Sequence, residues 1–344
     1  MAALLPISNP PNPWRTAEVE YLDDEPPPSA RLEVYEDHTR QILASNDSPD
    51  LGFSWSVNPY RGCFHACAYC FARPSHEYLG LGAGTDFDRK ITVKPDAPRL
   101  LREAFEKPGW SGELVVFSGV TDCYQPLEAS YRLTRGCLEV CREYRNPVGL
   151  ITKAPLIERD LDVLVALNQV AAVSVTVSIP IWDREHSHAL EPFVATPQRR
   201  MKTIERLAAA GLDVGVNLAP IIPGLSDADI PQVLEAAHAA GARRAGFVFL
   251  RLPGSVAKVF EERLRAALPL RADRVLNRVR DARGGKLYDS RFGIRGQGSG
   301  PYAEAARALF DKTVQRLGMN PDCHGPGGAD TFQRPGRGRQ LPLW

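Results

Sequence analysis

Between residues 114 and 250, short apolar runs alternate with segments of helical periodicity. The apolar runs cover residues 114–118, 148–152, 172–178, 213–218 and 245–250, and the helical segments between them cover 129–144, 157–168, 196–210 and 227–240. Apolar runs of this length are typical of buried strands, and intervening helices indicate that the strands are parallel. With a strand over 53–57 and a helix over 98–107, the chain has six strand–helix units. Periodicity alone does not separate an open sheet from a barrel.

The pattern divides the 344 residues into four segments. Residues 1–50 are a proline-rich arm and lead-in, and residues 51–252 form the α/β core. Residues 253–319 form a basic, α-rich extension, with helices over 257–283 (interrupted at Pro269) and 302–317 and a glycine-rich stretch between them that predicts a hairpin. Residues 320–344 lose periodicity, so we expect a mobile tail.

Charge is unevenly distributed along the chain. From Arg251 to the end there are 18 Lys and Arg against 9 Asp and Glu, whereas the preceding residues have 24 against 32. The C-terminal third is therefore a candidate surface for a polyanion such as nucleic acid. The alternative is an arginine-rich helix face that only water contacts.

No stretch approaches the roughly 18 uninterrupted apolar residues of a membrane span. The first residues also lack the basic and apolar regions of a secretory leader. The chain has seven cysteines, an odd number that favours reduced thiols and metal binding over disulfides. We therefore expect a cytoplasmic protein with no membrane partner.

Three of the cysteines lie close together after the first strand of the core. Cys63, Cys67 and Cys70 have the spacing CxxxCxxC. A structural zinc site needs four ligands, and no second CxxC or HxxxH follows at a suitable distance. Iron–sulfur clusters are held by clustered thiolates, and three cysteines leave one iron of a cubane free to bind another molecule. The alternative is a set of buried free cysteines.

The CxxxCxxC spacing, with Tyr69 before the last cysteine, resembles the signature of the radical S-adenosylmethionine (SAM) superfamily. The surrounding NPYRGC and the later segment TDCYQPLE resemble the spore-photoproduct-lyase-related branch. The resemblance implies a partial (β/α)6 barrel of TIM type over about residues 52–252. It also implies a [4Fe-4S] cluster and SAM as cofactors, and a reductase or flavodoxin-type protein as electron donor.

Ligands of a parallel barrel gather at the carboxyl ends of its strands. In the lyase-like enzymes, a Ser/Thr–Asp pair after the second strand, a lysine after the third and a serine after the fourth contact SAM. The matching positions are Thr121, Asp122, Lys153 and Ser178, and Tyr69 is expected near the adenine. Asp122 suits the SAM amino group and Lys153 its carboxylate. Each also has an ordinary explanation: Asp122 as a helix cap, Lys153 as a surface residue, Ser178 as a turn former.

Asn217, after the fifth strand, is a further candidate for cofactor binding. The lyase has one more cysteine, just before its Ser/Thr–Asp pair, that donates hydrogen to the product radical. The matching position here is near Gly119 or Val120, so that donor is missing. Cys123 is the candidate replacement, or has no catalytic role. Cys137 and Cys141 are expected in the core rather than as an accessory pair.

The last five residues resemble the short peptides with which bacterial repair proteins bind the replication sliding clamp. The positions that would contact the clamp are Gln340, Leu341, Leu343 and Trp344. Apolar anchors on a mobile tether suit peptide-in-groove recognition. The alternative is a tail that folds onto its own barrel.

Three functions are consistent with these features. The first is a radical SAM enzyme, lyase-like, that acts on nucleic acid in DNA repair. The second is a radical SAM enzyme with a small-molecule, RNA or protein substrate. The third is a non-catalytic, metal-stabilised adaptor bound to the clamp. The sequence does not identify the substrate.

Overall fold

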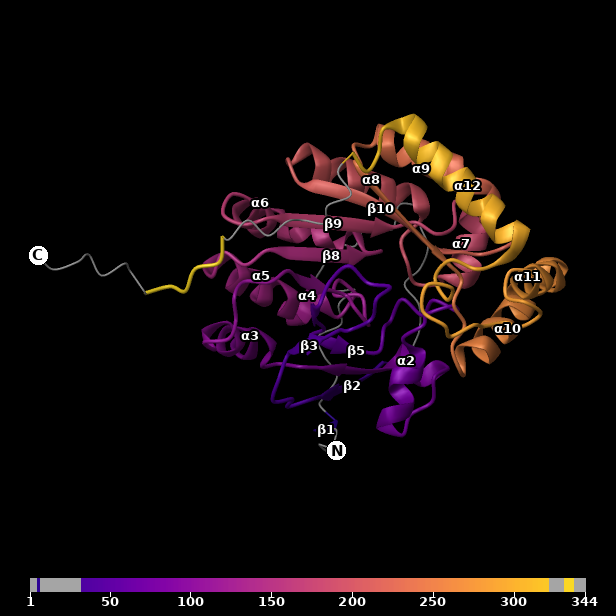
Figure 1. Cartoon of the computed structure of the whole chain (residues 1–344). Helices are drawn as coiled ribbons and strands as arrows, with labels where there is room; N and C mark the ends of the chain where they lie inside the picture. The colour runs from indigo at the N-terminus through magenta and orange to yellow at the C-terminus, as the bar shows by residue number, and fades with distance from the viewer. Residues whose placement is uncertain (1–4, 7–31, 322–330, 337–344) are drawn as a thin grey trace, which may run out of the picture.

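The main sheet of the protein is a partial barrel of parallel strands (Figure 1). The computed structural model describes residues 5–6, 32–321 and 331–336. Seven strands lie in the order β11-β10-β9-β8-β7-β4-β3, all parallel except the edge strand β3. Their bounds are β3 Leu43–Ser45, β4 Trp55–Val57, β7 Val115–Phe117, β8 Val148–Thr152, β9 Val173–Ser178, β10 Asp213–Ile221 and β11 Arg244–Phe249. Because β11 does not pair with β3 or β4, the barrel stays open, and the predicted partial (β/α)6 barrel is confirmed.

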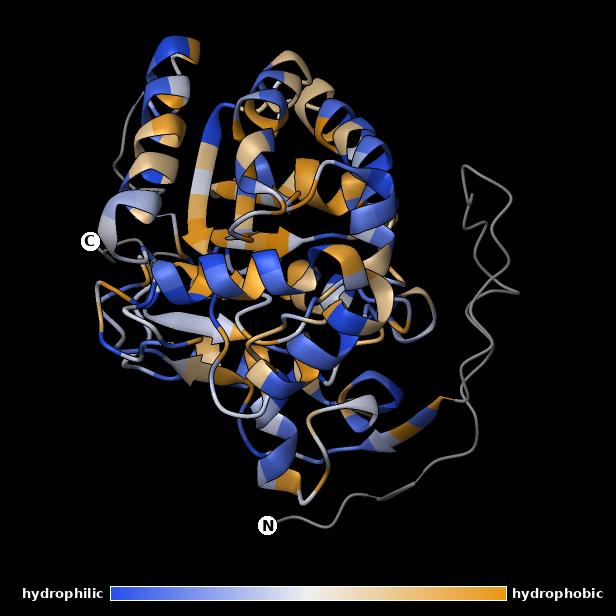
Figure 2. Ribbon diagram, turned by 90° about the vertical axis from the view of Figure 1, so that its right-hand side faces the viewer, coloured by the Kyte–Doolittle hydropathy of each residue, from blue (hydrophilic) through white to orange (hydrophobic). Residues whose placement is uncertain are grey.

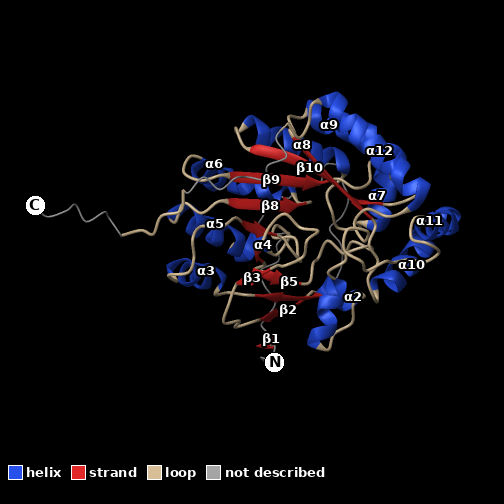
Figure 3. Cartoon of the chain, in the orientation of Figure 1, coloured by secondary structure: helices blue, strands red, loops and turns tan. Residues whose placement is uncertain are grey.

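Helices cover the outer face of this sheet (Figure 3). They are α3 Ala97–Glu106, α5 Leu133–Glu143, α6 Leu161–Asn168, α8 Pro197–Ala209, α9 Ile230–Ala239 and α12 Gly300–Leu317. Residues alternate between the two faces of each strand. On β9, Val173, Val175 and Val177 join the main core, whereas Ser174, Thr176 and Ser178 face the other side. The helices carry both hydrophobic and hydrophilic residues, as expected for elements with one buried face (Figure 2).

Some helices differ from their predicted extents. The single helix expected over 129–144 is broken at Arg132, whose φ is 53°, into α4 Glu128–Tyr131 and α5. The Glu128 carboxylate accepts hydrogen bonds from the backbone N–H groups of Thr134 and Arg135 and so starts α5 anew. The helices expected over 157–168 and 227–240 begin with 3-10 turns, η2 Pro155–Asp160 and η3 Asp227–Asp229. One helix, α7 Arg184–Leu190, was not predicted, because its seven residues carry little periodicity.

A second, smaller sheet was also not predicted. It has the order β1-β2-β6-β5, with β1 Leu5–Pro6, β2 Glu33–Glu36, β6 Lys90–Val93 and β5 Tyr60–Arg61. The short 3-10 helix η1 Arg73–Leu79 and the helix α2 Thr85–Arg89 lie between β5 and β6 in the chain. Each strand has four residues or fewer, and every pairing joins segments far apart in the sequence, so no local pattern marks them. The expected arm over residues 1–50 therefore contains strands of both sheets.

The basic extension lies at the carboxyl end of the barrel. Its first two helices, α10 Val256–Ala267 and α11 Pro269–Asp281, are separated at the predicted proline. In Figure 1 they lie on the side toward which the arrows of β8, β9 and β10 point. Apolar residues of both helices, including Phe260 and Leu276, share a core cluster with Cys67 and Tyr69. The extension therefore packs directly on the cysteine loop.

The hairpin predicted in the glycine-rich stretch after α11 is absent. Residues 284–299 form turns, with Gly284, Gly285, Gly293 and Gly298 at positive φ. The buried guanidinium of Arg283 donates to the carbonyls of Leu250, Ile294 and Arg295. These contacts hold the stretch against the end of β11 without a strand ladder.

Residues 331–336, part of the expected mobile tail, contact the barrel. The Phe332 ring lies 6.0 Å from the Phe105 ring, and Arg334 donates to the carbonyls of Phe105, Lys107 and Trp110. Apolar and charge-assisted contacts therefore anchor this segment on the barrel. The clamp-like residues Gln340, Leu341, Leu343 and Trp344 lie outside the described residues. Within the described ranges, no helix has the length and apolar character needed to cross a membrane.

Candidate active site

The three clustered cysteines lie on a tight loop after β5. Cys63 and Cys67 are buried and Cys70 is half-buried. Gly62 has φ +82°, and a Cβ at this position would lie 2.8 Å from the imidazole of His76. Only glycine fits both the left-handed backbone and this close approach. The chain therefore enters the loop through an obligatory turn.

Side chains from three other segments hold the loop from outside. Arg73, fully buried, donates through Nε and Nη2 to the carbonyl of Cys67 at 3.0 and 2.8 Å. Arg263 of α10 donates to the carbonyl of Ala66 at 2.7 Å. The Asp88 carboxylate pairs with both guanidinium groups. Since the carbonyls point to these arginines, protein contacts fix the backbone of the loop without a bound metal.

The donor set fits an iron–sulfur cluster better than a single ion. Burial raises the pKa of all three thiols, that of Cys67 to about 12. The negative charges of Asp122, Cys67 and Cys70 raise the pKa of Cys63 further. Among residues 5–6, 32–321 and 331–336, no three His, Cys, Asp or Glu side chains are placed to hold one metal ion. A cubane binds each cysteine through a different iron, so its ligands need not meet at one point.

Asp122 joins three segments of the site. Its Oδ1 accepts hydrogen bonds from the backbone N–H of Tyr124 at 2.9 Å and the hydroxyl of Thr152 at 2.8 Å. Its Oδ2 accepts from the backbone N–H of Lys153 at 2.8 Å and lies 3.4 Å from Nδ1 of His65. Burial acts to raise the pKa of Asp122, but His65 and the backbone donors hold it below the usual value. Asp122 thus connects the ends of β7 and β8 to the cysteine loop, and its contact with SAM stays a prediction.

Thr121 has a buried hydroxyl with no partner in the described part of the chain. The residue is 3% exposed, and its Oγ1 makes no hydrogen bond to any described residue. Its backbone N–H and that of Val120 point to Oδ1 of Asn58, which fixes the loop after β7. An unpaired buried hydroxyl costs free energy unless a ligand satisfies it. This orphaned atom, next to Asp122, is the observation that favours a polar cofactor at the site.

A second buried network fixes Tyr69 and the end of β9. The Tyr69 hydroxyl donates to Glu191, which also pairs with Arg200 at 2.7 Å. Arg200 donates to the carbonyl of Ser178 at 2.8 Å. Burial acts to raise the pKa of Glu191, but Arg200 and Lys153 lower it overall. The Lys153 ammonium lies 5.9 Å from the centre of the Tyr69 ring, so the structure brings Tyr69 and Lys153 together.

Of the two remaining predicted residues, Asn217 lies opposite Ser178 in the pairing of β9 and β10, and Cys123 directly follows Asp122. The Asn217 side chain, on β10, fills the space beside Gly246, where a Cβ would lie 2.7 Å from its Oδ1. Cys123 is fully buried in the main core with Cys137 and Cys141, and burial raises the pKa of its thiol. The expected role of Cys123 as a hydrogen donor gains no support from this position, whereas the core position expected for Cys137 and Cys141 is confirmed.

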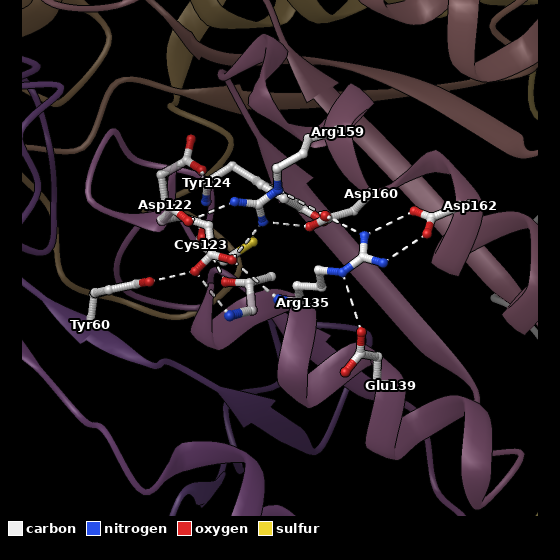
Figure 4. Close-up of polar contacts among 11 residues, drawn as sticks. Tyr60, Asp122, Cys123, Tyr124, Arg135, Glu139, Arg159, Asp160 and Asp162 are labelled. Atoms are coloured by element: carbon white, nitrogen blue, oxygen red, sulfur yellow. Dashed lines mark hydrogen bonds and ion pairs between the residues drawn. The ribbon is translucent and has the colours of Figure 1, made fainter. Parts of the chain in front are cut away.

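A charged network lies beneath the loop after β7 (Figure 4). Tyr60 donates to the fully buried Glu128, and Arg159 donates to Glu128 at 2.9 Å and to Asp160 at 2.8 Å. Arg135 donates to Asp160 at 3.0 Å. This network ties β5, α4, α5 and η2 together directly behind Asp122 and Cys123.

Sequence reasoning missed His65, Arg73, Arg263 and Glu191 as parts of the site. Of these four residues, His65 could have been suspected from the sequence, because it lies between two cysteines of the motif. Arg263 and Glu191 contact the loop across more than a hundred residues of chain, so only the fold shows their role.

Comparison with protein families gives one match, to the model described as the radical SAM superfamily, over residues 57–237. Uncharacterized proteins of Mycobacterium tuberculosis and Mycobacterium bovis are 41% identical over 207 residues, which is 60% of this chain and 61% of theirs. The chain thus matches about three fifths of the length of these relatives. A radical SAM Nalpha-GlyT isomerase of Pseudomonas phage M6 is 22% identical over 83% of this chain and 56% of its own.

Solved structures of spore photoproduct lyase share the fold. A mutant of that lyase matches with a TM-score of 0.60 and 17% identity over 83% of this chain and 80% of its own. The lyase in complex with a dinucleoside spore photoproduct matches with a TM-score of 0.59 and 15% identity over the same shares. At this identity the likeness concerns the fold alone.

Proposed function

Because the chain belongs to the radical SAM superfamily, we propose that it binds a [4Fe-4S] cluster through Cys63, Cys67 and Cys70 and acts on nucleic acid. When bound, the cluster and SAM supply reductive cleavage of SAM to methionine and a 5′-deoxyadenosyl radical, which abstracts hydrogen from the substrate. The protein's own contribution is to place the cofactors and to keep water away.

The observation that carries this proposal is the arrangement of the loop and the strand ends. The cysteine loop lies at the carboxyl end of the barrel, where its His65 contacts Asp122 and its Tyr69 faces Lys153. The Thr121 hydroxyl is unpaired there. We assign Thr121, Asp122, Lys153 and Ser178 to SAM binding, with Tyr69 beside the adenine and Asn217 on the barrel wall.

Support for a nucleic-acid substrate comes from the basic extension. It lies at the barrel mouth, where Arg271 and Arg274 are exposed and, among the described residues, form no ion pair. The related lyase fold has been solved with a dinucleoside photoproduct. Positive groups at the mouth would hold the phosphate backbone while a base reaches the site.

One observation favours a different substrate. Arg265, Arg291 and Arg295 pair with Asp273, Asp289 and Asp50, so much of the positive charge of the extension is neutralised within the protein. A radical SAM enzyme that acts on a small molecule, an RNA or a protein is therefore the second candidate.

Substrate-dependent cleavage of SAM separates these candidates. Anaerobically reconstituted protein with SAM and dithionite is assayed for 5′-deoxyadenosine with and without DNA oligonucleotides, undamaged or irradiated. Our proposal expects oligonucleotides to bind with salt-dependent affinity and to increase 5′-deoxyadenosine formation. Absence of DNA affinity at low salt favours the second candidate. A protein that makes no 5′-deoxyadenosine under any condition would be a non-catalytic adaptor.

A further inference from the structure

The small sheet has one face in a core and an opposite face that carries charges of both signs, with Glu33 of β2 opposite Lys90 of β6. Tyr60, Ile91 and Val93 belong to an apolar cluster on the first face. In the antiparallel pair of β5 and β6, Arg61 lies opposite Thr92, so their side chains project to the same face. Lys94 is two residues beyond Thr92 and projects to that face as well. Three potential donors therefore lie together, beside the entry to the cysteine loop (Figure 1).

Two of the three cations of this face, Arg61 and Lys94, have no ion-pair partner among the described residues. Arg61 and Lys94 are both half-buried, and within the described part of the chain neither side chain has an ion pair or a hydrogen bond. Burial and the charge of Arg61 lower the pKa of Lys94, and only Asp37 acts in the opposite direction. Lys90, on the same strand, instead pairs with Asp86 at 3.0 Å. Arg61 and Lys94 thus lie close enough to repel each other, whereas Lys90 is paired.

The hydroxyl of Thr92 is a third donor on this face, opposite Arg61 and two residues before Lys94. Thr92 is 1% exposed, and among the described residues its Oγ1 has no hydrogen-bond partner. A guanidinium, an ammonium and a free hydroxyl offer donors to a ligand that must supply several acceptor oxygens. A phosphate group meets this requirement, since arginine binds two of its oxygens at once and lysine adds a compact charge.

We propose that Arg61, Thr92 and Lys94 form a binding site for a phosphate group. On the premise of the proposed function, the site holds a backbone phosphate of the nucleic-acid substrate. Arg61 is followed directly by Gly62 and Cys63, so a strand anchored here passes beside the cysteine loop. The positive charges of Arg61 and Lys94 would then be neutralised by the phosphate.

The first test measures the response of the full chain to inorganic phosphate. The melting temperature of the native protein should rise with added phosphate at constant ionic strength. The Lys94→Gln variant should melt at the same or a higher temperature in phosphate-free buffer, because a repulsion is removed, and should lose the response. Lys258→Gln, on the exposed surface of α10, is the matched control and should respond like the native protein. A phosphate response that survives both Lys94→Gln and Arg61→Gln overturns the site.

The second test concerns the nucleic-acid strand. Affinity for a single-stranded oligonucleotide, measured by anisotropy against salt, should drop several-fold in Lys94→Gln, and the salt slope should fall by about 0.7. An unchanged slope, with the inorganic-phosphate response lost, contradicts the strand contact and assigns the site to a free phosphate or a mononucleotide.

The assay of SAM cleavage keeps this proposal distinct from the proposed function. Native protein without phosphate or oligonucleotide should form 5′-deoxyadenosine, so this assay reports SAM cleavage separately from the phosphate site. A native protein that binds phosphate through Lys94 but never cleaves SAM would contradict the proposed function and leave the phosphate site standing.

Discussion

At the residue scale, the cysteine motif identifies the expected metal ligands but not the residues that fix the backbone of the loop. The spacing of Cys63, Cys67 and Cys70 predicts metal ligands because packing alone does not require three thiols so close together. The donors that fix the loop are Arg73 and Arg263, and the second comes from a helix almost two hundred residues later. Their role depends on tertiary contacts, which no local pattern encodes.

Arg263 gives a test of this support. Arg263→Gln removes the hydrogen bond to the carbonyl of Ala66 and the ion pair with Asp88. We expect a loss of about 1–3 kcal/mol in stability and a lower iron content per chain, because a buried carbonyl and carboxylate lose a partner. The measurement is iron analysis together with thermal unfolding.

The matched control is Arg265→Gln on the same helix. Arg265 pairs with Glu261 and Asp273 on the surface, so its loss should leave the iron content unchanged. Equal iron contents in the two variants would show that Arg263 does not support the loop.

Thr121 tests the assignment of the cofactor pocket. Thr121→Val removes a hydroxyl that has no protein partner, so the ligand-free protein should be as stable as before or more stable. SAM affinity should fall roughly 5–10-fold, the effect of about one lost hydrogen bond. Calorimetric titration with SAM measures it, with Thr313→Val on α12 as control, since that hydroxyl already donates to the carbonyl of Leu309. Undiminished SAM affinity in Thr121→Val would remove the hydroxyl from the site.

At the element scale, periodicity predicts the long elements and fails for the short ones. The six parallel strands of the barrel and the helices α3, α5, α6, α8, α9, α10, α11 and α12 follow apolar patterns, and their ends agree to within a few residues. β2, β5 and β6 are short and depend on pairing with distant segments, and β3 and α7 are too short to carry a pattern of their own. The predicted hairpin failed because Arg283 binds the backbone of the glycine-rich turns.

The ion pair between α5 and α6 predicts that the stability of the folded protein decreases at low pH. Asp162, at the start of α6, pairs with Arg135 of α5 at 2.7 Å, and this lowers its pKa to about 2. A carboxyl with a lowered pKa in the folded state adds stability above its unfolded pKa, about 3.9, and loses it as the pH falls toward 2. Because Asp162 is mostly exposed, we expect no more than about 0.5 kcal/mol at pH 7.

Denaturant unfolding of Asp162→Asn from pH 7 to pH 3 measures this contribution. The stability difference from the native protein should be constant down to about pH 5 and shrink below pH 4. Asp47→Asn, at an exposed site with no ion pair in the structure, serves as control. A difference that grows at low pH would contradict the assignment.

At the scale of the whole molecule, the open barrel and the extension together build the site. The order β11-β10-β9-β8-β7-β4-β3 leaves the barrel unclosed, and α10 and α11 pack on the cysteine loop at its carboxyl end. The sequence predicts the barrel and the strand-end residues, and the structure brings Thr121, Asp122, Tyr69 and Lys153 to that end. It does not predict that the extension supports the loop, because this depends on how distant segments pack.

The central claim is that the loop cysteines start radical chemistry with SAM. The most direct test is formation of 5′-deoxyadenosine by anaerobically reconstituted protein with SAM and dithionite, compared with a variant in which Cys63, Cys67 and Cys70 are all changed to alanine. A variant with Cys137→Ala and Cys141→Ala, two core thiols outside the loop, is the control. Our account predicts product and iron–sulfur absorbance in the native protein and the control, and neither in the triple variant. Product or iron–sulfur absorbance that survives loss of the three loop cysteines would contradict it.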